Sequence, residues 1–143
     1  MQLRPWALVL ALVAGSASAQ EAHVSVYDGT FDDAAFELEQ AITSQGLVVD
    51  HVSNVGEMLS RTGADVGSDI TIFDNAVVYA FCSAQISRQV MEADPANIVH
   101  CPYTIYVAER DGQVTLGYRD FPDGPMQAVE DLLGSIVAEV TGG

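Results

Sequence analysis

Two cysteines, Cys82 and Cys101, are the residues whose type and number most directly suggest chemistry in this chain. In an oxidising compartment, an even number of cysteines is most simply explained by a disulfide bond. A bridge that closes a loop of this size stabilises a domain by about 3 kcal/mol, because it restricts the unfolded chain. We therefore expect a structural disulfide between these two residues.

A thiol-redox role is the alternative interpretation of the same pair. Cys82 directly precedes a predicted helix, and the dipole at a helix N-terminus lowers the pKa of a thiol. In this role Cys82 would attack a disulfide substrate, and Cys101 would resolve the mixed disulfide. The motif Cys-x-x-Cys, which is typical of thiol oxidoreductases, is absent, because Cys82 is followed by Ser-Ala-Gln.

A metal or haem site is a third interpretation, with Cys82, His100 and Cys101 as its ligands. Thiolate and imidazole suit soft and borderline metal ions. However, His100 and Cys101 are neighbours on a predicted strand, where successive side chains point to opposite faces. Covalent c-type haem is not expected, because the sequence has no Cys-x-x-Cys-His motif. His23 is expected to be an ordinary solvated histidine.

Four further residues are candidates for contact with a ligand or another subunit. Tyr103 and Tyr118 lie on the two strands of a predicted hairpin, where exposed tyrosines would form a groove floor or a dimer face. Arg88 and Arg119 are scarce positive charges, and each is a candidate anion contact. We find no catalytic set of residues, so the sequence names no reaction and no cofactor, and we expect a protein that is not an enzyme.

The N-terminus has the pattern of a signal peptide. Arg4 precedes an apolar run, residues 7–15, that is too short to span a bilayer. Ala17, Ser18 and Ala19 are the small residues that a signal peptidase recognises, and a polar chain follows from Gln20. We expect cleavage after Ala19, a periplasmic location, and one mature domain, residues 20–143, with no membrane span.

The charge of the chain limits its partners. It contains 5 Lys and Arg residues against 20 Asp and Glu residues, and one of the five, Arg4, belongs to the expected signal peptide. The mature chain then has four positive and 20 acidic residues, a formal charge of −16. Because such a surface repels nucleic acid and anionic lipid, we expect neither as a partner.

The pattern of apolar residues predicts a mixture of strands and helices. Asp111-Gly112 is a strong signal for a two-residue hairpin turn, so the sheet cannot be wholly parallel. Thr30 and Ser83 are predicted helix caps, and Asn54 with Glu57 suits a capping box. The predicted strands are Val24–Tyr27, Leu47–Val52, Ile70–Phe73, Ala76–Cys82, Ile98–Ala108 and Gln113–Arg119, and the predicted helices follow Thr30 and Asn54 and span Ala84–Ala93 and Met126–Val140. This order predicts an α+β two-layer sandwich, with a mixed, mostly antiparallel sheet and helices on one face.

Several short motifs, taken in order, resemble the bacterial family called domain of unknown function 302, over about residues 27–119. They are Thr30-Phe31-Asp32, Phe81-Cys82-Ser83-Ala84, Glu92-Ala93-Asp94-Pro95 and Cys101-Pro102-Tyr103. The resemblance implies a fold like that of the TATA-binding protein, a tendency to dimerise, and no established activity. Many members look like Cys-Asn-Pro at the first cysteine and Pro-Cys at the second, so this chain, with Cys101-Pro102, has the second pair inverted.

These observations favour an exported binding or accessory protein that forms a homodimer. Its partner is expected to be a second copy, a small molecule or a periplasmic protein, which meets an apolar, tyrosine-bearing surface of the sheet. The thiol-redox protein and the metal or haem binder are the alternatives.

Overall fold

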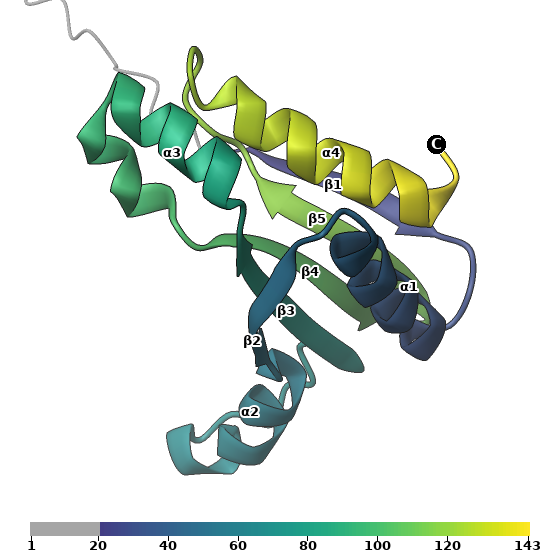
Figure 1. The fold of residues 1–143 in the computed structure, drawn as a ribbon. Helices are drawn as coiled ribbons and strands as arrows, with labels where there is room; N and C mark the ends of the chain where they lie inside the picture. Colours follow the sequence, from purple (N-terminus) through teal and green to yellow (C-terminus); the bar gives the residue numbers. More distant parts are fainter. Residues whose placement is uncertain (1–20) are drawn as a thin grey trace, which may run out of the picture.

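The computed structural model describes residues 21–143, which form a five-stranded antiparallel sheet with helices along it (Figure 1). The elements are β1 (Ala22–Tyr27), α1 (Phe31–Ser44), β2 (Val48–Ser53), α2 (Val55–Thr62), η1 (Ala64–Val66), β3 (Asn75–Cys82), α3 (Ala84–Ala93), η2 (Pro95–His100), β4 (Tyr103–Arg110), β5 (Gln113–Arg119) and α4 (Gln127–Thr141), where η marks a short 3₁₀ helix. This confirms the α+β two-layer sandwich. The expected signal peptide lies outside the described residues.

The strands are arranged in the order β1-β5-β4-β3-β2, and every neighbouring pair is antiparallel. The predicted hairpin is confirmed, because Asp111 and Gly112 join β4 to β5 with φ angles of 52° and 75°. The connection between β3 and β4 contains a helix, which would permit parallel pairing, but the chain returns antiparallel, with Phe81 opposite Tyr103. The sheet is therefore antiparallel throughout the described chain rather than mixed.

One face of the sheet and the inner sides of α1 and α4 form the core. Phe81, Ile105 and Leu116 on the strands are fully buried, as are Leu38 of α1 and Leu133 of α4. Burying a side chain of this kind contributes about 1.5 to 3 kcal/mol. The buried stripe of α1 is Ala34, Leu38, Ala41 and Ile42, so the helix is rotated slightly from the stripe of Phe31, Ala35, Leu38 and Ile42 that its sequence suggests.

The predicted caps of two helices are present. The Thr30 hydroxyl accepts a hydrogen bond from the Asp33 amide at 3.1 Å, and the Ser83 hydroxyl accepts one from the Ile86 amide at 3.3 Å. At α2 the expected capping box does not form, since Asn54 makes no side-chain capping bond.

Two predicted strand segments have another conformation. Residues 98–100 belong to η2, in which Pro95 takes the first position and Asp94 accepts a hydrogen bond from the Ala96 amide at 2.9 Å. Ile98 is 62% exposed, so no sheet buries its side chain. Residues 70–73 likewise form no strand, and Ile70 and Ile72 remain exposed. In both segments branched residues favour a strand, but the Asp94 cap starts a 3₁₀ helix in the one, and the other pairs with no described strand.

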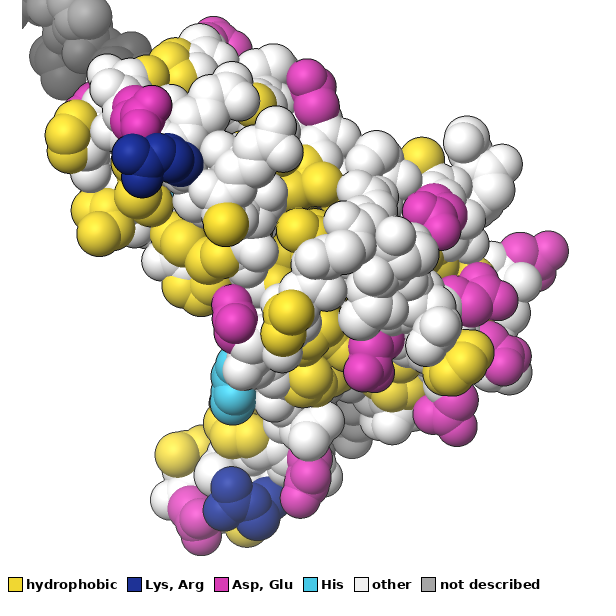
Figure 2. All heavy atoms as spheres, in the orientation of Figure 1, with side chains coloured by type: hydrophobic (Ala, Val, Ile, Leu, Met, Phe, Trp, Pro, Cys, Tyr) yellow, Lys and Arg dark blue, Asp and Glu magenta, His cyan; other side chains and the backbone are white. Residues whose placement is uncertain are grey.

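Figure 2 shows acidic side chains scattered over the face that carries the helices, among apolar and other side chains, with positive side chains near α3 and at the far end of α2. At α3, Arg88 forms an exposed ion pair with Glu92 at 2.9 Å. Among residues 21–143, no helix is long and apolar enough to cross a membrane.

Candidate functional site

The fold brings the two cysteines together. Cys82 ends β3 and Cys101 lies just before β4, so the pair flanks the connection between these strands, residues 83–100, which contains α3 and η2 and is called here the α3–η2 excursion. Their Sγ atoms are 2.6 Å apart, and both side chains are partly exposed. The structure contains them as two thiols rather than as a disulfide, in a position from which a bond can form with little movement.

Burial raises the pKa of Cys82 to about 12, and the neighbouring Cys101 and Asp50 act in the same direction. A backbone hydrogen bond with Tyr103 opposes this rise but does not reverse it. In the first turn of α3, the Ile86 amide donates its hydrogen bond to the Ser83 hydroxyl. The lowered pKa that the helix start suggested for Cys82 is therefore a wrong expectation, and this thiol is a weak nucleophile at neutral pH.

His100 does not lie on a strand, so the expectation that it and Cys101 point apart on a strand is wrong. It ends η2, its ring meets Phe121 edge-on with ring centroids 5.5 Å apart, and its buried Nδ1 has no hydrogen-bond partner among residues 21–143. Burial lowers its pKa, and Arg119 adds to this effect. Although the two Sγ atoms are close, the ligand atoms of Cys82, His100 and Cys101 do not form one of the sets of three in the described chain that lie within 4.8 Å of one another.

The two candidate tyrosines do not form a shared exposed floor, because Tyr103 is buried and Tyr118 is half-buried beside a hollow next to α4. Tyr103 is 1% exposed and its hydroxyl lies 3.0 Å from the Ser87 hydroxyl, so this side chain belongs to the core. Tyr118 packs toward α4, where a Cβ added to Gly134 would come within 3.0 Å of its hydroxyl. The expectation of an exposed tyrosine floor from these two residues is therefore wrong, because both lie on the helix side of the sheet.

Tyr106, one residue out of phase with them, lies on the opposite side. A Cβ added to Gly117 would meet its ring at 2.6 Å, so the ring lies over that glycine. The register places Val24, Gly117, Tyr106, Val78 and Ser53 in one row across all five strands. We call this side of the sheet, which the helices leave uncovered, the open face.

The open face is rich in apolar and neutral residues. Val24, Val26 and Val48 are 56%, 59% and 71% exposed there. Phe73 and Ala108 line a shared hollow, so the segment before β3 crosses one end of this face. Apart from Asp50 in the bulge of β2, no described strand residue on this face is acidic. The other strand residues of the open face are Ala22, Val24, Val26, Val48, His51, Ser53, Ala76, Val78, Ala80, Cys82, Thr104, Tyr106, Ala108, Arg110, Gln113, Thr115, Gly117 and Arg119.

The two candidate arginines are not placed together. Arg88 is on the exposed side of α3, in its ion pair with Glu92. Arg119 ends β5, with its guanidinium carbon 5.8 Å from the centre of the Phe121 ring. An exposed pair of charges on one helix contributes about 0.3 to 0.5 kcal/mol.

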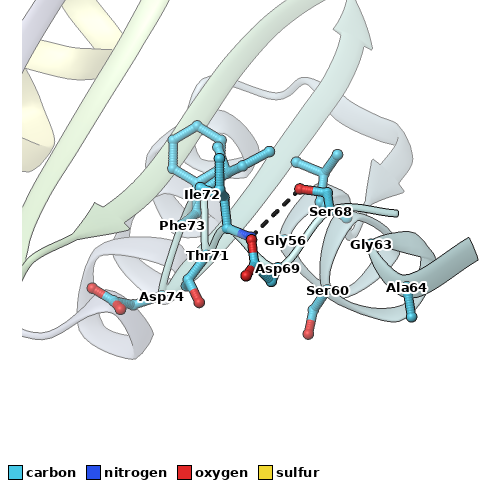
Figure 3. A pocket seen from close by; sticks show the side chains of 12 residues that line it. Gly56, Ser60, Gly63, Ala64, Ser68, Asp69, Thr71, Ile72, Phe73 and Asp74 are labelled. Carbon is cyan, nitrogen blue, oxygen red and sulfur yellow. Dashed lines mark hydrogen bonds between the residues drawn. The ribbon is translucent and has the colours of Figure 1, made fainter. Parts of the chain in front are cut away.

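A hollow of about 510 Å³ separates α2 and η1 from residues 68–74, as Figure 3 shows. Its lining combines hydroxyl groups, carboxylates and apolar side chains, among them Ser60, Asp69 and Phe73. In Figure 3 the Ser68 hydroxyl accepts a hydrogen bond from the Ile70 amide at 3.4 Å. Among the described residues, this lining contains no His, Cys, Lys or Arg, so it offers hydroxyls and carboxylates without an imidazole, a thiol or a positive charge beside them.

An antiparallel five-stranded sheet with its helices on one face defines a small α+β sandwich protein. The family model described as "Domain of unknown function DUF302" matches residues 22–141, and the chain therefore belongs to this family. The resemblance seen in the sequence motifs is thus confirmed, with a longer extent.

A solved relative supports the fold. The crystal structure of an uncharacterized conserved DUF302 protein from Bacillus stearothermophilus is similar with a TM-score of 0.70. The similarity covers 83% of this chain and 97% of that one, at 15% sequence identity. No curated protein matches the chain. At this identity, the likeness describes the fold and assigns no activity.

Proposed function

We propose that this protein is an exported, non-enzymatic binding or accessory protein that forms a homodimer through its open face. The observation that carries the proposal is the character of this face: exposed valines and a half-buried tyrosine, with Asp50 as the one acidic residue among its described strand residues. Asp111 borders the same face at the turn after β4, in the hollow that Phe73 and Ala108 line, on a chain with 20 acidic residues.

Charge selects a second copy as the occupant of the open face. Two copies, each with a formal charge near −16 after removal of the signal peptide, repel each other over most of their surfaces. A contact through the open face, whose strand residues are mostly neutral and include Asp50, Arg110 and Arg119 as charged ones, avoids placing the many carboxylates of the two copies opposite each other. It also removes from water the valines that are now exposed, and this burial favours association.

A disulfide between Cys82 and Cys101 is part of the proposal. An exported chain meets an oxidising compartment, and the two Sγ atoms are already 2.6 Å apart. The bond would close the α3–η2 excursion at its base and stabilise the folded protein by about 3 kcal/mol. Since Cys82 is one of the residues of the open face, the bond would also fix one end of that face.

Sedimentation equilibrium of the purified protein tests the dimer. We expect the mass of two chains for the wild type and the mass of one chain for Val24→Asp, which adds a charge to the open face. Phe36→Asp is the matched control, because Phe36 is a 65% exposed apolar residue on α1. A wild type that remains one chain at high concentration would refute the dimer, and so would equal effects of the two variants.

The second candidate is a thiol-redox protein, favoured by the closeness and partial exposure of the two thiols. In it the Cys82 thiolate attacks a substrate disulfide and releases one substrate thiolate. Cys101 then attacks Cys82, which leaves an oxidised pair and a reduced substrate. The raised pKa of Cys82 disfavours the first step. Sustained reduction of a disulfide substrate in the presence of a thiol reductant, lost in Cys82→Ser, would favour this candidate over the binding protein.

A further inference from the structure

Three side chains from separate parts of the chain meet beside α4. His23 is on β1, Asp120 follows β5 and Glu130 lies near the start of α4. One potential ligand atom from each lies within 4.8 Å of the others. His23 Nε2 is 3.3 Å from Asp120 Oδ1 and 3.7 Å from Glu130 Oε2. The Glu130 side chain is 13% exposed, whereas those of His23 and Asp120 are 47% and 45% exposed.

These separations fit a shared cation better than direct ion pairs. With metal-ligand distances of about 2.0 to 2.2 Å, neighbouring ligand atoms of a tetrahedral site are about 3.4 Å apart. Both distances from Nε2 are near this value and exceed the roughly 2.7 to 2.9 Å of a strong charge-assisted hydrogen bond. Moreover, Nε2 carries at most one proton and cannot donate a linear bond to both carboxylates.

The surrounding contacts hold two of the ligands in place. The His23 ring stacks on Tyr118 with centroids 4.8 Å apart and an interplanar angle of 19°. Glu130 Oε1 accepts a hydrogen bond from the Phe121 amide at 2.7 Å, which leaves Oε2 toward His23, with the Gln127 side-chain amide 3.4 Å away. Such supporting contacts orient ligands in natural metal sites.

We propose that His23, Asp120 and Glu130 bind one divalent cation of the zinc class. One imidazole and two carboxylates suit borderline first-row metals, whereas magnesium and calcium prefer all-oxygen sites. His23 also borders a hollow of about 280 Å³ that Tyr118 and Gly134 line, so a water molecule or a small anion can reach a fourth position. The site goes beyond the proposed function and does not depend on the dimer or on the cysteines.

Calorimetric titration with Zn²⁺ tests the site, using purified protein without an affinity tag and freed of metal by chelation. We expect one Zn²⁺ per chain, and an affinity at least about tenfold weaker in His23→Ala and in Glu130→Gln. Glu139→Gln is the matched control, because Glu139 is an exposed carboxylate on the same helix as Glu130, and it should bind as the wild type does. If Glu130→Gln does not fold, His23→Ala decides alone, since its ring is half exposed.

The spectrum of the Co²⁺ complex separates this site from one at the cysteines. Nitrogen and oxygen ligands give only weak visible bands, whereas thiolate ligands add intense near-ultraviolet charge transfer. We expect the weak bands alone, with the same spectrum in Cys82→Ser. The proposal is overturned if the wild type binds no Zn²⁺, if His23→Ala binds as tightly as the wild type, or if Cys82→Ser abolishes binding.

Discussion

At Cys82, two influences on the thiol act in opposite directions. A position just before a helix favours the thiolate, whereas burial beside Cys101 and Asp50 favours the thiol. Burial is the larger effect and raises the pKa to about 12. The residue type was visible in the sequence, but its protonation was not, because desolvation depends on neighbours that only the fold supplies.

This raised pKa predicts the reactivity of the reduced protein. Unfolded cysteine loses its proton near pH 8.5 to 9, whereas folded Cys82 keeps its proton until about pH 12. The raised pKa therefore favours the folded, reduced form below pH 9, and this contribution is lost as pH rises toward 12. After reduction and removal of the reductant, we expect iodoacetamide to modify Cys82 more slowly at pH 8 than in the urea-unfolded chain.

Peptide mapping by mass spectrometry measures that rate at each residue. Without reduction, the same method should find no free thiol and an intact mass lower by the two hydrogens of a disulfide. Rapid alkylation of folded Cys82 at pH 7 would contradict the account and support the redox candidate.

At the scale of elements, turn and cap motifs predict the backbone correctly, whereas strand-like composition alone does not. The Asp111-Gly112 turn and the Thr30 and Ser83 caps are present as predicted, because each depends on a few neighbouring residues. Residues 98–100 have strand-like composition, yet Pro95 and the Asp94 cap start a 3₁₀ helix there. Propensity alone could not decide this segment, since Ile98 and Val99 remain exposed.

Alanine substitutions at two glycines, Gly117 on β5 and Gly134 on α4, test how closely side chains pack over the sheet. A Cβ at Gly117 would lie 2.6 Å from the Tyr106 ring and 2.7 Å from the His23 backbone oxygen, which cannot withdraw without moving β1. We expect Gly117→Ala to lower the free energy of unfolding by about 1 to 3 kcal/mol. Urea unfolding followed by circular dichroism measures the change.

Gly134→Ala is the control. At this helical position the nearest atom is the Tyr118 hydroxyl at 3.0 Å, at the end of a side chain, and alanine favours a helix over glycine by about 1 kcal/mol. We expect no loss of stability for this variant. An unfolding midpoint for Gly117→Ala equal to that of the wild type would mean that Tyr106 does not lie over β5.

At the scale of the whole molecule, the order of the strands decides which distant residues become neighbours. The sequence predicted the two-layer class and the hairpin, but strand order depends on pairings between distant segments. That order places β1 beside β5, which brings His23 next to Asp120 and Glu130, a set that is spread over a hundred residues of sequence. His23 was predicted to be an ordinary solvated residue, because no local spacing indicates these neighbours.

The distribution of charge is also a property of the whole molecule. Period-two alternation directs the apolar odd-numbered residues of β3 and β4 toward the helices and leaves Val78 and Tyr106 on the open face. The sequence shows the number of carboxylates, and the fold shows how few of them the strands of this face carry. Our central claim is that a second copy covers this face in solution.

Relaxation of valine methyl groups by a soluble nitroxide tests that claim most directly. Val24 and Val26 on the open face are 56% and 59% exposed in the single chain, and Val66 and Val99 elsewhere are 77% and 73% exposed. At millimolar protein concentration, the account predicts that the methyl signals of Val24 and Val26 are protected far beyond this difference, and that dilution removes the protection. Relaxation in proportion to the exposed fraction of each valine, at every concentration, would contradict it.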